Sequence, residues 1–472
     1  LSTLATIRGK ASALAAYETF TGNPNQIGED LKKYKKLKPE DLMRVFKKYI
    51  KGAYAVHLSC VPKGGSELIA APDNAGRPEV PQGFSPDLSM YANLKYRKAK
   101  DTFDRSVRPK PGPNPVVQLP SIWEADLLDG GKAIGAPYDE VPLVSVRLSW
   151  PGGRMAEGMN EAGLAKLTAS MLNESTKKSS KEALRDRMDL LGAEVSAYAS
   201  EDEMGFNVRA PFANIDKALA ILEEMILEPG FKEEEFKRVK MEQLEDIANE
   251  ENNAGALANK TLFRYMFPNH VLGISGNGTK EIISRMEVAD VMGFCDRIFS
   301  PALVRVAVVG IDHPDNIIPS LSFLSKMPSR MSQVNLGAAD SRFPEKTKLI
   351  LVDKPGAAQS EIRYAFDGPP YSATGLHYQL NVANYVLGGA FNSRLNLNLR
   401  EDKGYTYGVR SGFRGNRFYG YYLVSGAFLK ESTDKTIVEI VKELKKYREE
   451  GPGDEEIAFT RSSIGQRDAL NY

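Results

Sequence analysis

The sequence has few of the side chains that cross-link chains or bind metals. Its 472 residues include only two cysteines, Cys60 and Cys295, and four histidines. Two cysteines cannot build a framework of disulfides. Each lies in an apolar run, where a small buried residue is the simplest interpretation. The cysteines therefore give no argument about the compartment in which the protein works.

An excess of charge of one sign and long apolar runs are also missing. Lys and Arg total 62 against 61 Asp and Glu, so the net charge is +1. A nearly neutral chain offers no electrostatic reason to bind nucleic acid or an acidic membrane surface. Because no run of about 18 apolar residues occurs, we expect no transmembrane helix. We also find no nucleophile elbow and no phosphate-binding loop. The composition is that of an ordinary globular protein.

The chain begins at Leu1 and ends at Tyr472 inside helical patterns, so we interpret it as a portion of a longer protein. Its length and shifts in composition predict four segments. They are 1–66 as the tail of a preceding domain, 67–118 as a linker, 119–330 as one α/β unit, and 331–472 as the truncated start of another.

The predicted linker is rich in Pro and Gly and carries a basic run at 95–100. Its segment 108–115 has four prolines in eight residues and cannot be helical. The basic run fits either a docking surface or a solvated linker, and we favour the linker.

Apolar periodicity predicts alternating strands and helices through both α/β units. Strands are predicted at 132–136, 143–150, 193–199, 204–210, 303–310, 348–353, 360–367, 405–413 and 418–426, and another at 54–61. Helices are predicted at 1–20, 39–51, 160–174, 180–191, 214–228, 232–249, 254–266, 287–299, 313–325, 374–387, 391–401, 431–449 and 454–470. The strand and helix of 204–228 resemble those of 418–449, which suggests duplicated units.

Two short runs near the C-terminal end carry a family resemblance. Residues 388–395 read Gly-Gly-Ala-Phe-Asn-Ser-Arg-Leu, and residues 399–407 read Leu-Arg-Glu-Asp-Lys-Gly-Tyr-Thr-Tyr. This string resembles the substrate-clamp segment of the pitrilysin/insulinase (inverzincin) zinc metallopeptidases, in which a helix ends in Arg and a Tyr follows seven residues later. The resemblance implies that Arg400 holds substrate main chain and that Tyr407 stabilises the oxygen that becomes negative during hydrolysis. From residue types alone, we would favour an ion pair of Arg400 with Glu401 or Asp402 and a surface strand position for Tyr407. The full string favours the clamp.

Residues 163–171 resemble the zinc-binding helix of the same family, but its functional residues are replaced. The family reads Gly-x-Ala-His-x-x-Glu-His-Met, and this chain reads Gly-Leu-Ala-Lys-Leu-Thr-Ala-Ser-Met. Lys166 and Ser170 stand in the two ligand positions and Ala169 in the position of the general base. An ammonium group only donates hydrogen bonds and repels a dication, and a methyl group cannot accept a proton. We therefore expect no metal, no cofactor and no catalytic residue in this chain.

The family takes its third zinc ligand, a Glu, from a helix further along. Glu242 and Glu245 lie in the corresponding helix, and we expect a solvated helix face there. His270, in a turn that resembles the family's, is expected to be a structural histidine.

The resemblance implies an α+β fold of repeated α/β units, with antiparallel-rich sheets packed with helices. It also implies an inactive C-terminal half that closes a peptide chamber, while zinc belongs to a catalytic half that is fused or separate. The expected partners are that half and a peptide substrate, with no nucleic acid. A bacterial source would suggest the periplasm. A binding or assembly scaffold and an independent hydrolase of unrecognised chemistry are the alternatives.

Overall fold

The computed structural model describes residues 6–61, 63–70, 116–328 and 343–468, together with residues 4, 104, 107, 112, 113, 334 and 336. The chain divides into two compact units, Thr6–Pro113 and Asn114–Tyr472, with the first five residues counted in the second. The basic run at 95–100 and most of the predicted linker at 67–118 lie outside the described residues. No helix in the described ranges is both long enough and apolar enough to cross a membrane.

The first unit contains three helices, α1 (Ile7–Thr21), α2 (Ile27–Lys36) and α3 (Pro39–Tyr49). None of the three buries a residue. The predicted strand at 54–61 is wrong: this segment pairs with no strand in the described part of the chain, and Tyr54, Val56 and Leu58 are exposed. An apolar pattern forms a strand only where a neighbour completes the hydrogen-bond ladder.

A six-stranded sheet forms the centre of the second unit, in the order β1-β2-β6-β3-β5-β4. The strands are β1 (Trp123–Asp126), β2 (Lys132–Ala136), β3 (Leu143–Pro151), β4 (Glu194–Ala199), β5 (Glu203–Pro211) and β6 (Arg305–Val309). Neighbours are antiparallel except β2 and β6. The predicted strands in this region are confirmed, whereas β1 was missed because four residues are too few to establish a period.

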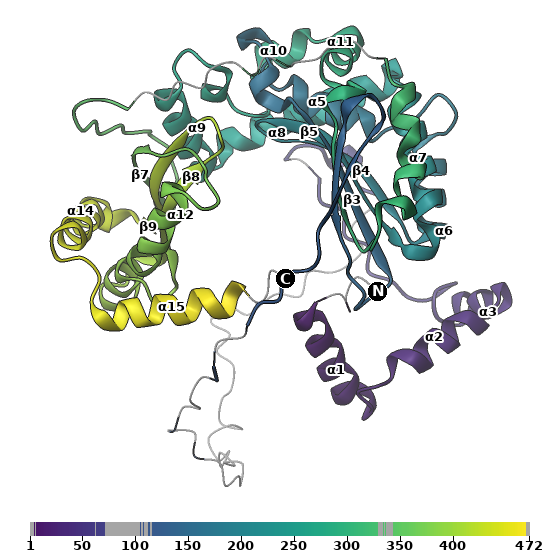
Figure 1. Cartoon of the computed structure of the whole chain (residues 1–472), viewed down its shortest axis with the longest axis horizontal. Coiled ribbons are helices and arrows are strands. Elements are labelled where there is room, and N and C mark those ends of the chain that lie inside the picture. Colours follow the sequence, from purple (N-terminus) through teal and green to yellow (C-terminus); the bar gives the residue numbers. More distant parts are fainter. Residues whose placement is uncertain are drawn as a thin grey trace. The chain divides into compact units, whose positions relative to one another are not determined.

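One face of this sheet is covered by helices, as Figure 1 shows for α5, α6 and α7. The remaining helices of this part are α8 to α11, and α10 was missed because it has only six residues. The bounds are α5 (Leu164–Leu172), α6 (Lys181–Leu191), α7 (Ile215–Leu227), α8 (Glu233–Asn252), α9 (Ala254–Met266), α10 (Lys280–Arg285) and α11 (Val288–Ile298). Alternate residues of β3, such as Val146 and Leu148, are fully buried against these helices, and those between them, such as Arg147, are exposed. The sheet thus has one apolar face and one open polar face.

A second sheet repeats part of the first. Its order is β7-β9-β8, all antiparallel, which corresponds to β3-β5-β4 of the first sheet. The elements are β7 (Gln359–Gly368), α12 (Leu376–Ala383), α13 (Arg394–Asn396), β8 (Thr406–Gly415), β9 (Gly420–Leu429), α14 (Thr433–Glu450) and α15 (Asp454–Asp468). The predicted repeat and the predicted α+β class, with helices packed on largely antiparallel sheets, are confirmed.

Two predicted features of this part are corrected. The helices predicted at 374–387 and 391–401 both contain π-helical segments, Tyr385–Gly389 and Leu397–Asp402. The strand predicted at 348–353 does not form, and Leu349 and Leu351 are exposed. In the first sheet β2 is held by its parallel neighbour β6, and the described part of the second sheet has no strand in that position.

The second sheet packs against the first part of the same unit through a small apolar cluster. Phe267, next to α9, contacts Tyr419 of the second sheet with ring centroids 4.8 Å apart. The Tyr419 hydroxyl donates to the Glu201 carboxylate at 2.7 Å. Arg363 of β7 donates to Asn259 of α9 at 2.6 Å. The second sheet is thus held to the first part of the unit both by apolar packing and by hydrogen bonds.

Candidate functional site

Helix α5 carries the three residues that the family resemblance places in the zinc-motif positions. Lys166 and Ser170 are half-buried and one turn apart, and Ala169 is buried beside Ser170. The helix begins after Gly163, whose φ of +95° favours glycine. A Cβ at Gly163 would lie 2.7 Å from the Asn277 carbonyl oxygen. Position 163 must therefore lack a bulky side chain and adopt a left-handed backbone conformation for α5 to start in this place.

A buried carboxyl group closes the start of α5. Glu157 accepts hydrogen bonds from the main-chain N–H groups of Ala165 at 2.7 Å and Gly163 at 3.2 Å. Burial raises the pKa of Glu157 to about 8, although these two hydrogen bonds and nearby Arg154 act in the opposite direction. Glu157 is thus a structural cap whose charge depends on pH near neutrality.

The Lys166 ammonium group stands among oxygen atoms. It donates to the Asp246 carboxylate of α8 at 2.7 Å and also to the Asn277 side-chain oxygen. Asn277 is itself held by Glu250. Lys166 therefore places a covalently attached cation next to a carboxylate of α8, the helix from which the third zinc ligand would come.

The residues of this helix do not fit a zinc ion. A site with an ammonium, a methyl group and a hydroxyl in the motif positions has no imidazole donor and places a positive charge against the metal. In the described part of the chain, no three His, Cys, Asp or Glu side chains are grouped to hold a metal. Glu242 pairs with Arg238 at 2.6 Å and Glu245 is exposed.

Asp246 is the carboxylate that meets α5, and sequence reasoning missed it. The only sequence signal was its position one turn after Glu242, on a helix with many acidic residues.

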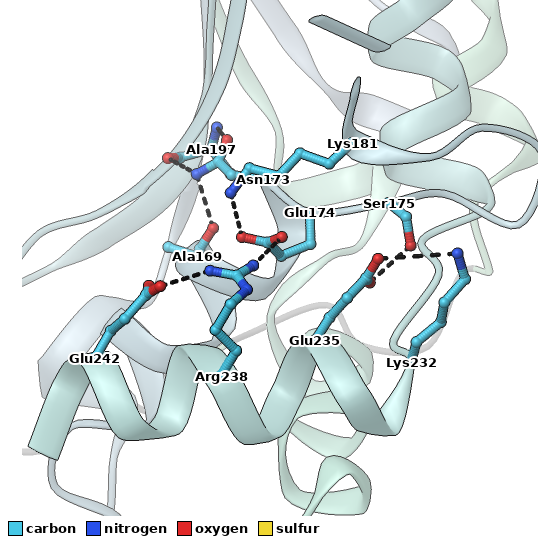
Figure 2. A network of polar contacts seen from close by, with 10 residues as sticks. All are labelled: Ala169, Asn173, Glu174, Ser175, Lys181, Ala197, Lys232, Glu235, Arg238 and Glu242. Atoms are coloured by element: carbon cyan, nitrogen blue, oxygen red, sulfur yellow. Dashed lines mark hydrogen bonds and ion pairs between the residues drawn. The ribbon is translucent and has the colours of Figure 1, made fainter. Parts of the chain in front are cut away.

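Asn173, just after α5, closes part of the free edge of the first sheet. β4 is the edge strand, and the main-chain N–H and C=O of Ala197 point away from β5. The Asn173 side chain accepts from the Ala197 N–H at 2.7 Å and donates to the Ala197 carbonyl at 2.9 Å (Figure 2). It also donates to the Ala169 carbonyl at 2.9 Å. One carboxamide therefore takes the place that an adjacent strand would occupy at Ala197.

A second polar network ties the end of α5 to α8. Figure 2 shows Arg238 between the carboxylates of Glu174 and Glu242. Glu174 is buried and also accepts from Lys181 at 2.7 Å. A buried carboxylate with two cationic partners is stable only while both are present. Glu242 thus takes part in a structural network.

The Arg400 side chain lies at the end of the π-helical segment Leu397–Asp402. Its guanidinium group pairs with Glu401 and lies 4.5 Å from the centre of the Phe391 ring. Leu399 is fully buried, and the Tyr405 N–H donates to its carbonyl at 2.8 Å. The turn that follows Arg400 is therefore fixed, and its side chain keeps 32% exposure.

Tyr407 lies in an irregular part of β8. The pairing of β8 with β9 shifts register between Thr406 and Val409, which places Tyr407 in a β-bulge. Its side chain is 92% exposed. Bulges re-aim side chains and often occur beside functional sites. The Thr406 hydroxyl, which donates to the Ala427 carbonyl at 2.7 Å, holds the bulge in place.

Other residues of the two motif runs have structural roles. Arg394 forms a two-pronged ion pair with Glu456 of α15, with both N–O distances at 2.6 Å. Asn396 accepts from the Val409 N–H at 2.9 Å and so joins the helix to the bulge. His270 accepts from the Leu272 N–H at 3.2 Å, and its burial lowers its pKa. No described hydrogen bond or ion pair joins the α5 positions to Arg400 or Tyr407.

Two protein-family models match consecutive parts of the chain. Residues 136–280 match the model described as insulinase (peptidase family M16). Residues 285–464 match the model described as peptidase M16 inactive domain. The expectation that the chain contains only the inactive half is therefore too narrow, because the first of these stretches is of the peptidase type.

Individual proteins agree with these matches. The chain is 26% identical over 330 residues to "Non-peptidase homolog YmxG" of Helicobacter pylori, which covers 68% of this chain and 74% of that protein. It is 26% identical over 316 residues to an "Uncharacterized zinc protease" of Rickettsia felis, which covers 66% and 72%.

A solved structure has the same fold. It is the peptidase M16 inactive domain from Pseudomonas fluorescens, with a TM-score of 0.64 and 22% identity over 74% of this chain and 86% of that chain. A domain of the peptidase type and a domain of the inactive type thus follow one another along the sequence, and the chain belongs to the insulinase-type M16 peptidase family.

Proposed function

We propose that this chain is a member of the M16 family that does not hydrolyse peptides by itself. It contributes to a peptide chamber whose zinc is held by a catalytic half, either fused or separate. The observation that supports this proposal is the ion pair between Lys166 and Asp246, 2.7 Å apart, at the residues where the family resemblance would put the metal site. A lysine there neutralises the Asp246 carboxylate and stands in place of an imidazole that a zinc ion would need.

Arg400 and Tyr407 are the residues that we propose to act on substrate, and we call them the clamp residues. Both retain access to solvent, since the Arg400 side chain is 32% exposed and the Tyr407 residue is 92% exposed. The guanidinium group suits peptide carbonyl oxygens, and a phenol suits an oxygen that becomes negative. The ion pair with Glu401 is surface-exposed and therefore weak enough for substrate to replace.

The Helicobacter pylori relative is described as a non-peptidase homologue, which supports the absence of independent activity. The Rickettsia felis relative is described as a zinc protease and leaves the opposite outcome open to experiment. The four domain segments predicted from the sequence, 1–66, 67–118, 119–330 and 331–472, remain part of this proposal.

The test measures zinc content and peptidase activity of the chain alone and after mixing with a zinc-bearing M16 chain from the same organism. We expect no zinc and no turnover alone, and chelator-sensitive turnover on mixing. Tyr407→Phe or Arg400→Gln should then reduce turnover by about 100-fold, the typical effect of losing one donor to a developing oxyanion. Tyr378→Phe and Arg410→Gln, at other exposed positions of the same sheet and helices, serve as matched controls.

A binding or assembly scaffold with no role in peptide hydrolysis is the second candidate, because the Asn173 side chain blocks the β4 edge at Ala197 and so keeps an extended peptide from pairing there. It predicts that the clamp variants leave turnover of the mixture unchanged. Stoichiometric zinc or chelator-resistant turnover by the chain alone would contradict both candidates.

A further inference from the structure

A cavity of about 370 Å³ lies where the open face of the first sheet meets the second sheet. One wall comes from the ends of β3, β5 and β6 and the turn before β5. The other comes from Tyr371 and the turn between β8 and β9. This volume is at the lower end of the range for small-ligand sites, about 300–1,000 Å³. A cavity of this size can hold one end of a peptide but not a longer peptide segment.

The charges in the cavity wall are paired with one exception. Glu203 is held by Arg147 and by the Tyr198 hydroxyl, the latter at 3.0 Å. Asp202 pairs with Arg417 at 3.6 Å. Each carboxylate of the wall therefore has a cation.

The exception is Arg305. It lies on the open face of β6 and is exposed, and within the described residues its guanidinium group forms no hydrogen bond or ion pair. Its register neighbours on the sheet are Ser149 and Lys132. Lys132 forms an ion pair with Asp126. The cavity thus has one uncompensated positive charge, at Arg305.

Tyr371 supplies a second donor in the same cavity. Its main-chain N–H donates to the Asn416 carbonyl at 2.9 Å, and its ring lies 5.1 Å from that of His377. Its hydroxyl has no partner among the described residues. The planar guanidinium group of Arg305 and the hydroxyl of Tyr371 can both donate hydrogen bonds to a carboxylate.

We propose that this cavity binds the carboxylate of a peptide, with Arg305 as the charged partner and Tyr371 as a further donor. The proposal deepens the proposed function, because it names a chemical feature of the peptides that the chamber would retain. The same chemistry is offered by a C-terminal carboxylate and by an Asp or Glu side chain. Backbone and side-chain donors capture peptide termini in this way in other proteins.

The test uses the full chain and hexapeptides of Ala, Ser and Val with an uncharged fluorophore at the N-terminus. One peptide has a free C-terminal carboxylate, one is its amide, and one is the amide with a single internal Asp. We expect the free acid to bind about tenfold more tightly than the amide, the equivalent of one charge-assisted hydrogen bond. In Arg305→Gln the two should bind equally, and in Tyr371→Phe the difference should shrink.

Arg209→Gln is the matched control, because Arg209 is also exposed on the open face, has no described partner and lies outside the cavity. It should keep the difference between acid and amide. If the Asp-containing amide binds as tightly as the free acid, the cavity also accepts a side-chain carboxylate. If it binds as weakly as the amide without Asp, the cavity is specific for a C-terminal carboxylate. Equal binding of acid and amide by the wild type, or an equal loss in both arginine variants, would overturn the proposal.

A short carboxylate, N-acetyl-alanyl-alanine, separates this inference from the proposed function. Arg305-dependent binding of the dipeptide, with no binding of the hexapeptides, would support the cavity and count against the peptide chamber. Hexapeptide binding that ignores the carboxylate would support the chamber and reject the cavity.

Discussion

The side chain of Asn173 forms two hydrogen bonds with the main chain of Ala197, at 2.7 and 2.9 Å, in the way that a neighbouring strand would. β4 is an edge strand, and unpaired edges attract further strands. Asn173 therefore prevents strand addition at this point of the sheet.

Asn173→Ala should open the edge. Three hydrogen bonds are lost, so we expect the free energy of unfolding to fall by about 1–3 kcal/mol. Hydrogen exchange of the Ala197 amide should become faster, and that of the neighbouring β4 amides that face β5 should stay slow. Asn207→Ala, on the open face of β5, is the control and should change neither. Unchanged exchange at Ala197 would show that Asn173 does not cap the edge in solution.

Replacing Lys166 and Ser170 by histidine should create a metal site. In the double variant Lys166→His and Ser170→His, two imidazoles lie one turn apart on α5, and Asp246 is the third ligand. We expect this variant to bind about one zinc ion per chain in competition with a chromogenic chelator, and the wild type to bind none. Adding Asp246→Asn should weaken the binding at least about tenfold, since a charged ligand is lost. If Asp246→Asn has no effect, another residue completes the site.

The buried Glu157 should make stability depend on pH. Its pKa is raised from 4.5 to about 8 in the folded protein, so the folded state binds this proton more tightly than the unfolded state. Its contribution to stability is complete below about pH 4.5 and is lost as the pH rises through about 8. Glu157→Gln should therefore gain stability relative to the wild type with rising pH, by up to about 1.4 kcal/mol per pH unit.

Urea unfolding of both proteins between about pH 5 and 9 measures this difference. A constant difference across the range would mean that Glu157 titrates at the same pH in both states.

The two arginines of the motif runs should behave differently. Arg394 forms a two-pronged ion pair with Glu456 and is only 19% exposed, whereas Arg400 pairs with an exposed neighbour. We expect Arg394→Gln to lower the free energy of unfolding by about 1–3 kcal/mol and to make α15 sensitive to proteolysis. Arg400→Gln should change stability by less than about 1 kcal/mol. Equal losses would indicate that Arg400 is structural as well.

Most of the secondary structure followed from apolar periodicity, because the long elements bury one face. β3 and α7 have the alternation and the helical repeat that burial on a sheet or a core requires. Among the failures were segments without a partner, as at 54–61 and 348–353, and elements too short to show a period, such as β1 and α10. Periodicity records which side chains avoid water, and it carries no information about whether a neighbouring strand exists.

The sequence by itself, through its resemblance to the family motif, predicts that Lys166, Ser170 and Ala169 stand in the positions of zinc ligands and base, and the chemistry of these side chains argues against a metal there. The family resemblance also predicts Arg400 and Tyr407 as clamp residues, and this stays a prediction. Only the tertiary structure decided which carboxylate meets Lys166, that Asn173 closes an edge, and that Arg305 lies in its cavity without a partner among the described residues. The Asn173–Ala197 and Lys166–Asp246 contacts join residues that are 24 and 80 positions apart. They depend on the packing of helices on sheets, which fixes distances that no local pattern encodes.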